Sequence, residues 1–290
     1  MEREKLIAYS IKYEGEYSKI SNAISNKEDI EPVICDNCIT IFDENYPKKL
    51  LELKQPPFVL YYKGNLDLLN KDCYAVVGTR NPCEYSMKAT KDFVNRNNDK
   101  VIISGLAKGI DTIAHKNAKD TIAVLGCGID YIYPLENKEL FSTIEIHGLL
   151  LSEYPANTKP VSYHFPFRNR LIACLSDCVY AMEVNKYSGT MGTINYALEL
   201  GRNIKVLPFS IYDEIEGVNS NKDIYNNTLI NEGASSITSD ELFQKNDIDI
   251  DYSIYLKDKL DNTLNIINQF NKESFINGTT NKNNEKGYEK

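Results

Sequence analysis

Three short apolar segments in the middle of the chain each end abruptly at a turn rich in glycine, serine or threonine. The segments with their turns are residues 73–80, 101–105 and 179–190. A buried strand, a small-residue turn and a helix form the repeating unit of a parallel α/β sheet. Backbone N–H groups at the start of each helix attract anions. The pattern therefore predicts a sheet with a phosphate-binding edge.

The region from 73 to 210 continues this alternation. Strands are expected at 73–77, 100–103, 121–125, 149–152, 178–183 and 204–208, and helices at 84–96, 109–118, 137–146, 169–175 and 191–201. The strands are apolar without a period of two, as expected when both faces of a sheet are covered. This predicts an α/β fold with a doubly wound, mostly parallel sheet, an extended Rossmann-like domain. Its ligands would bind beyond the carboxyl ends of the strands, where the three turns fall.

The flanking segments predict smaller additions to this domain. Residues 1–44 read as a short helical segment, and the apolar segment after Pro56-Pro57 predicts an edge strand that ends at Gly64. We expect the Rossmann-like domain to span 45–245, with a helix over 225–232. Residues 246–290 are expected to hold a helix at 253–271 and a polar, disordered tail.

Charge is distributed unevenly along the chain. The net charge of −8 divides into −3 for residues 1–72, +2 for 73–210 and −7 for 211–290. The acidity therefore lies outside the predicted core, which remains able to face phosphates.

Cysteine usage and hydropathy predict a cytoplasmic protein. Seven cysteines, most of them in apolar segments, fit a reducing cytoplasm. No apolar run is long enough for a transmembrane helix, and the N-terminus does not resemble a signal peptide. Cys35 and Cys38 form a C-x-x-C without a second ligand pair, so a structural role is favoured over zinc or redox chemistry and no metal is expected.

The first turn, Gly78-Thr79-Arg80, excludes the common nucleotide motifs. It lacks the G-x-G-x-x-G of dinucleotide sites, and the chain lacks a Walker A lysine motif, so no cofactor is expected by those routes. Arg80 directly follows a strand-terminating Gly-Thr and could clamp a phosphate with its two-pronged guanidinium. The alternative is a surface arginine paired with an acid.

The second turn combines glycines with charged residues. Gly105 and Gly109 allow close backbone approach to a ligand, and Lys108 can add positive charge. Asp111 either faces the ligand or caps the following helix. His115 lies on the same helical face as Asp111, and a packing or hydrogen-bonding role is favoured over catalysis.

A third basic element is Arg168-Asn169-Arg170, next to Phe165 and Phe167. Arginines beside aromatic rings at a helix start are typical of nucleic-acid contacts, since charge neutralises the backbone while a ring stacks on a base. The two arginines do not share a helical face, so one of them is expected to make structural contacts.

These motifs together resemble the DprA/Smf family, DNA-processing protein A, over roughly residues 45–245. The matching segments are 77–80 (VGTR), 104–111 (SGLAKGID), 124–128 (VLGCG), 133–134 (YP), 152–155 (SEYP), 168–170 (RNR) and 186–190 (KYSGT). The chain departs from the family in three places. Residues 1–44 are no clear copy of its N-terminal helical domain, and 246–290 look too short for its winged-helix domain. The Pro-Gly that follows the last strand in the family pattern is Pro208-Phe209 here.

The resemblance implies a cytoplasmic bacterial protein that binds single-stranded DNA as a homodimer. Such proteins protect incoming DNA in natural transformation and help load RecA recombinase. Combining the resemblance with the turns gives the predicted DNA and phosphate contacts. They are Gly78, Thr79, Arg80, Ser104, Gly105, Lys108, Gly109, Arg168, Asn169, Arg170, Lys186, Ser188, Gly189 and Thr190.

An enzyme is the alternative. The sequence from Ser188 to Thr193 (SGTMGT) also resembles the P-G-G-x-G-T-x-x-E motif of nucleotide phosphoribohydrolases, which share a Rossmann-like core. That chemistry needs a carboxylate just after the Gly-Thr, and here the first acid is Glu199, nearly two turns on. A non-enzymatic DNA-binding protein is therefore favoured, with no catalytic residue.

Overall fold

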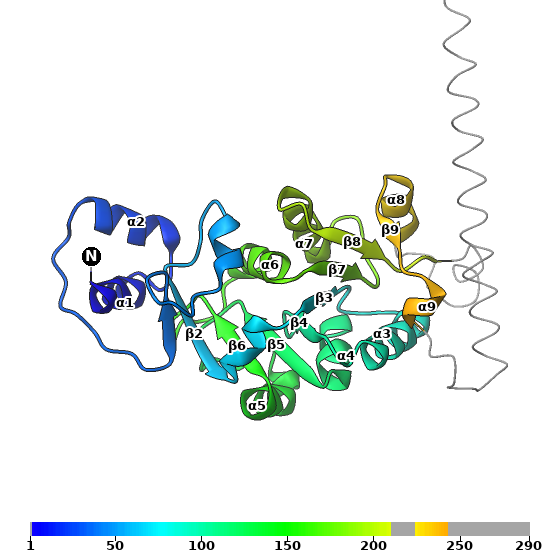
Figure 1. The fold of residues 1–290 in the computed structure, drawn as a ribbon, viewed down its shortest axis with the longest axis horizontal. Coiled ribbons are helices and arrows are strands. Elements are labelled where there is room, and N and C mark those ends of the chain that lie inside the picture. Colours follow the sequence, from blue (N-terminus) through cyan, green and yellow to red (C-terminus); the bar gives the residue numbers. More distant parts are fainter. Residues whose placement is uncertain (1, 210–223, 243–290) are drawn as a thin grey trace, which may run out of the picture.

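The computed structural model describes residues 2–209 and 224–242, which form one nine-stranded sheet between helices (Figure 1). The strand order is β1-β2-β6-β5-β4-β3-β7-β8-β9. The strands are β1 Cys38–Thr40, β2 Val59–Gly64, β3 Cys73–Val77, β4 Val101–Ser104, β5 Asp120–Leu125, β6 Leu149–Ser152, β7 Cys178–Ala181, β8 Asn203–Val206 and β9 Ser235–Ser236. From β6 to β9 every pairing is parallel, which confirms the doubly wound α/β prediction.

The antiparallel end of the sheet corrects one expectation. β2 is a strand, as the sequence predicted, and pairs antiparallel with β6, but it is not the edge. The three-residue strand β1 pairs with its outer side through Cys38 to Thr40. A strand this short carries too few residues to show a periodic pattern.

Helices cover both faces of the sheet (Figure 1). On one side lie α3 (Glu84–Arg96), α4 (Ile110–Asn117) and α5 (Lys138–His147), and on the other lie α6 (His164–Leu175) and α7 (Gly189–Glu199). Alternate side chains of β3 pack on the two faces of the sheet. Val76 packs with Phe93 of α3, whereas Ala75 and Val77 belong to the core cluster that contains α6 and α7. Both side-chain sets of the strand are buried, which explains its continuous apolar sequence.

Smaller elements extend the sheet at its two ends. Helices α1 (Arg3–Lys12) and α2 (Tyr17–Ser25) pack against β1 and β2, while α8 (Asn226–Asn231) and α9 (Ser239–Leu242) lie at the opposite end (Figure 1). Short 3₁₀ helices are η1 (Lys48–Glu52), η2 (Leu66–Asn70) and η3 (Leu135–Asn137). The helix and tail expected within 246–290 fall outside the described residues. Within the described ranges, no helix is long and apolar enough to cross a membrane.

Helix α6 begins five residues earlier than its sequence predicted, at His164 instead of residue 169. Pro166 lies in its first turn, where the missing N–H group has no helical acceptor to lose. Arg168, Asn169 and Arg170 therefore lie inside the helix, not at its start, and all three side chains are buried.

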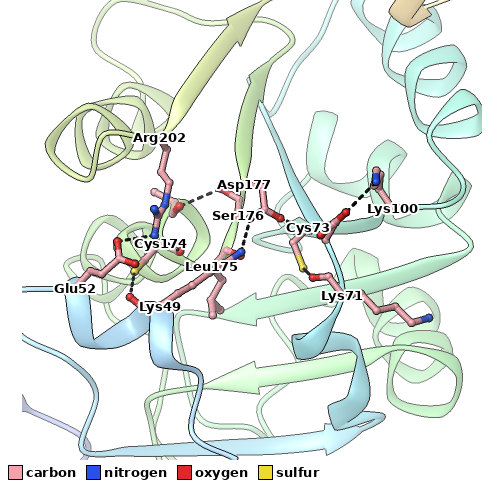
Figure 2. A network of polar contacts seen from close by, with 12 residues as sticks. Lys49, Glu52, Lys71, Cys73, Lys100, Cys174, Leu175, Ser176, Asp177 and Arg202 are labelled. Carbon is pink, nitrogen blue, oxygen red and sulfur yellow. Dashed lines mark hydrogen bonds and ion pairs between the residues drawn. The ribbon is translucent and has the colours of Figure 1, made fainter.

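A polar network fixes the amino ends of the central strands (Figure 2). The Asp177 carboxylate accepts hydrogen bonds from the Cys73 backbone N–H, at 2.8 Å, and from Lys49 Nζ, at 2.5 Å. Arg202 pairs with Glu52 at 2.8 Å and also donates to the Cys174 carbonyl oxygen in the last turn of α6. Cations at a helix C-terminus stabilise it. The amino ends of β3 and β7 are therefore tied together by protein contacts.

Candidate functional site

A cavity of about 510 Å³ lies at the carboxyl edge of the sheet, beside β3 and β7. The strand order reverses here, because β4 flanks β3 on one side and β7 flanks it on the other. Such a switch point is where doubly wound sheets bind ligands. The described residues that line the cavity are Val77, Gly78, Thr79, Arg80, Ala107, Asp111, Tyr133, Ser162, Phe165, Pro166, Arg168, Asn169, Ile172, Ser188, Gly189, Thr190 and Thr193.

The β3–α3 turn presents Arg80 to solvent beside this cavity. The Arg80 side chain is exposed and, within the part of the chain that the structure describes, makes no hydrogen bond or ion pair. The turn behind it is fixed by Glu183, whose backbone oxygen accepts from Thr79 N–H and whose Oε2 accepts from Cys83 N–H, both at 2.8 Å. The guanidinium is thus unpartnered on a rigid turn, as a phosphate clamp requires.

In two of the three turns, backbone N–H groups already bond a carboxylate of the protein. Glu183 bonds Cys83, the residue before α3. Asp111 Oδ2 accepts from the backbone N–H groups of Gly105 and Ala107, at 3.1 and 3.2 Å, in the turn before α4. Asp111 thus fixes the turn before α4, and it also lines the cavity. The sequence predicted that three turns form a phosphate-binding edge, and in two of them backbone N–H groups are already bonded to carboxylates of the protein.

The third N-terminus, that of α7, remains open. Ser188, Gly189 and Thr190 line the cavity, and a Cβ added at Gly189 would meet nothing within 4 Å. Ser188 Oγ is buried and lacks a hydrogen-bond partner among the described residues. The turn is fixed from behind by Asn169, whose Nδ2 donates to the Gly189 carbonyl oxygen at 3.0 Å. This helix start can accept an anion through its N–H groups and the serine hydroxyl.

Gly109 allows the β4–α4 turn to pack against the β3–α3 turn. It has φ +77°, and a Cβ here would lie 2.4 Å from the Thr79 carbonyl oxygen. The next residue, Ile110, donates its N–H to the same oxygen at 3.2 Å. Ser104 is fully buried and donates to the Val76 carbonyl oxygen. Gly109 and Ser104 thus shape the site from outside the cavity lining.

The two arginines of α6 have different surroundings. Arg168 lines the cavity but is 5% exposed, and its Nη1 donates to the carbonyl oxygens of Gly105 and Val124. Its burial lowers its pKa below the usual value, which the nearby Asp111 carboxylate partly offsets. Arg170 lies away from the cavity and pairs with buried Glu153, at 2.6 and 2.8 Å. Both arginines therefore make structural contacts, and Arg168 alone of the two lines the cavity.

The two predicted lysines also lie outside the cavity lining. Lys108 is ion-paired with Glu136. Lys186 is exposed, and its Nζ lies 5.6 Å from the ring centroid of Tyr187. The predicted DNA contacts of both lysines stay predictions.

Tyr133 is a lining residue that the sequence did not single out as a contact. Its ring lies 5.2 Å from that of Phe165, centroid to centroid, and both rings line the cavity. Tyr133 follows β5 in sequence, so only the fold brings it to α6. Its place in the YP segment of the family pattern was the available signal.

The two titratable groups His115 and Asp111 make hydrogen bonds within the protein. His115 Nε2 accepts from Leu106 N–H, which leaves Nδ1 to donate to Thr121 Oγ1 at 2.7 Å, and burial lowers the His115 pKa to about 3. Burial raises the pKa of Asp111, and it is the sole carboxylate among the described lining residues. The described residues also contain no cluster of three metal-ligating side chains.

The fold defines a Rossmann-like protein with a cavity at its switch point. The chain matches the family DNA recombination-mediator protein A over residues 37–246, and it belongs to that family. It is 42% identical over 206 residues to DNA processing protein DprA of Streptococcus pneumoniae, covering 69% of this chain and 70% of that one. It is 39% identical over 212 residues to DprA of Bacillus subtilis, covering 71% and 69%.

Solved structures agree with this assignment. The X-ray structure of Streptococcus pneumoniae DprA has a TM-score of 0.63 at 37% identity, covering 76% of this chain and 77% of that one. Helicobacter pylori DprA has a TM-score of 0.62 at 33% identity, covering 77% and 97%, and its structure is described as showing a single-stranded DNA binding mode.

Proposed function

We propose that the chain binds single-stranded DNA through the crevice between the β3–α3 turn and α7. The observation that carries this proposal is Arg80, an exposed guanidinium without an acidic partner in the described residues, beside a cavity with an aromatic wall. The open N-terminus of α7 supplies a second anion site, and Tyr133 with Phe165 supplies ring surface for a base. The single-stranded DNA binding mode described for the Helicobacter pylori relative supports the same ligand class.

The size of the cavity limits what it holds. A volume of about 510 Å³ is that of a small-ligand site, so the cavity accommodates roughly one or two nucleotides of a longer strand. Contacts to phosphates and ring faces read no base edge, so affinity should tolerate changes of sequence.

Fluorescence anisotropy with labelled oligo-dT tests the proposal. We expect submicromolar affinity that Arg80→Ala weakens without unfolding the protein. Arg96→Ala is the charge-matched control, because Arg96 ends α3 and a helix after a parallel strand runs back to the opposite edge. If Arg80→Ala binds as tightly as Arg96→Ala, the crevice is not the DNA site. If Arg80→Ala instead lowers Tm by many degrees, Arg80 was structural.

Salt dependence measures how many phosphates the site neutralises. Arg80, Lys186 and the start of α7 give two or three contacts. The slope of log affinity against log salt should then be about −1.4 to −2.1, at roughly −0.7 per phosphate on single strands. Arg80→Ala should make the slope less steep by about 0.7. A wild-type slope steeper than about −3.5 would require cations that this site does not contain.

Family membership supports further parts of the role. We propose that the protein acts as a homodimer in the cytoplasm, protects incoming strands during transformation and helps load RecA. The seven free cysteines fit that compartment. Light scattering tests the dimer, and nuclease protection of oligo-dT tests the sheltering of strands. A shortened lag in DNA-dependent ATP hydrolysis by RecA tests loading. A monomer that leaves the lag unchanged would overturn the dimer and the loading role.

We further propose binding without catalysis. Glu199, the first acid after the SGTMGT segment, is exposed on α7 and does not line the cavity. Release of free base from nucleoside monophosphates, measured by chromatography, should stay at the level of a protein-free control. Turnover without DNA affinity would instead favour the nucleotide hydrolase.

A further inference from the structure

A second aromatic surface lies just outside the cavity, on the β7–α7 turn. Tyr187 is 89% exposed, more than any other large apolar or aromatic side chain in the described residues. Lys186 Nζ lies 5.6 Å from the ring centroid of Tyr187 and 5.7 Å from that of Tyr225, within the range of cation–π attraction. We call Lys186, Tyr187 and Tyr225 the Tyr187 patch.

The cation of this patch makes no ion pair within the described residues. In the described ranges, Lys186 has no ion pair, whereas Lys108 is bound to Glu136. The Tyr225 hydroxyl donates to Glu232 at 3.0 Å, which fixes the ring that flanks the ammonium on one side. A positioned cation next to a free ring is the combination that sequence-tolerant single-strand sites use.

The patch also adjoins the proposed binding site. Tyr187 directly precedes Ser188, Gly189 and Thr190, which line the cavity at the start of α7. Tyr133 and Phe165 line the same cavity from other elements, the segment after β5 and the first turn of α6. A strand that places a phosphate at the start of α7 therefore has ring surface available within the cavity and again outside it at Tyr187.

We propose that Tyr187 stacks on a base of the strand that leaves the cavity, while Lys186 contacts an adjacent phosphate. This inference rests on the proposed binding of single-stranded DNA and extends its footprint over the β7–α7 turn. Tyr225 serves as a positioning residue for the lysine and does not itself contact the strand.

Binding of oligo-dT to single-residue variants tests the stacking. Tyr187→Ala should weaken binding about tenfold, or about 1.4 kcal/mol, at the lower end of the effect of losing one base–aromatic stack. Tyr187→Phe keeps the ring and should bind like the wild type. Phe42→Ala is the matched control, because Phe42 is 54% exposed near β1 at the far end of the sheet.

Abasic oligonucleotides distinguish the loss of base stacking from a general disturbance of the DNA-binding surface. A strand of the same length with abasic sites at every position should bind wild type and Tyr187→Ala equally, because no base remains to stack. An equal loss on both strands would show that Tyr187 acts only through the backbone or the fold, and would overturn the proposal.

Failure of the patch and failure of the crevice give different results. If Arg80→Ala weakens oligo-dT binding and Tyr187→Ala does not, the crevice stands and the patch is refuted. If neither variant affects binding, or the wild type does not bind, both proposals fall.

Discussion

Gly109 makes a sharp test of how the candidate site is built. Its φ of +77° is a conformation that alanine rarely adopts. A Cβ added there would lie 2.4 Å from the Thr79 oxygen and 2.6 Å from the Arg80 carbonyl carbon, and both are backbone atoms that no rotamer change can move. Gly109→Ala should therefore both strain its own turn and displace the turn that carries Arg80.

The two costs can be estimated separately. The backbone conformation of Gly109, with φ +77° and ψ −125°, costs about 1–3 kcal/mol for alanine, and overpacking against a fixed neighbour adds about 1–3 kcal/mol. The sum of roughly 2–6 kcal/mol corresponds to a Tm lowered by roughly 5–20 °C for a domain of this size. Gly201→Ala is the control for a positive φ without a collision, because Gly201 has φ +64° and nothing within 4 Å of the added Cβ.

Thermal unfolding followed by circular dichroism measures these differences, and oligo-dT anisotropy measures the effect on the site. Gly109→Ala should unfold well below Gly201→Ala and should bind DNA more weakly, because Arg80 has moved. A Tm equal to that of Gly201→Ala would refute the collision with the Arg80 turn. An unchanged affinity would refute the link between the two turns.

Three further changes probe the surrounding structure. His115 holds a pKa of about 3 against about 6.5 when unfolded, so the unfolded chain gains protons first on acidification. The wild type should therefore lose about 1.4 kcal/mol per pH unit between about 6.5 and 3 in urea titrations, and His115→Gln should lack this contribution. Asp177→Ala leaves Cys73 N–H without its acceptor, so it should cost about 1–3 kcal/mol in the same assay with no change in oligo-dT affinity. Glu183→Ala removes the acceptor of the Cys83 N–H group, so the Arg80 turn should become less fixed and oligo-dT affinity should fall severalfold. An affinity equal to that of the wild type would show that Glu183 is not needed to position this turn.

The central sheet was predictable from the sequence because its strands are apolar on both sides. Cys73–Val77 and Leu149–Ser152 coincide with the predicted ranges, and α3 coincides with its range of 84–96. Each of these elements buries either both faces of a strand or one stripe of a helix, so the spacing or the length of its apolar residues predicts it from the sequence. β1 and the early start of α6 were missed. Strand β1 has too few residues to show a period. In α6, Pro166 lies in the first turn, and a proline there argued against a helix at that point of the sequence.

The candidate site was predictable in position but not in its chemistry. Small-residue turns mark the carboxyl ends of strands, and the sheet brings those ends together. Which N–H groups remain free depends on acids placed elsewhere in the chain, since Glu183 follows β7 and yet bonds the residue before α3. Spacing within one turn cannot show this, because the partner is 100 residues away.

Pairing of charges, more than their number, decides what this edge of the sheet can bind. The predicted site had five cations, but the fold assigns them different states. Arg170 is bound to buried Glu153 and Lys108 to Glu136, while Arg168 is directed at carbonyl oxygens inside the protein. Arg80 and Lys186 alone among the five lack any hydrogen-bond or ion-pair partner in the described residues. They lie on the two turns that flank the switch point, β3–α3 and β7–α7, so a phosphate chain bound there would run from one turn to the other across the start of α7.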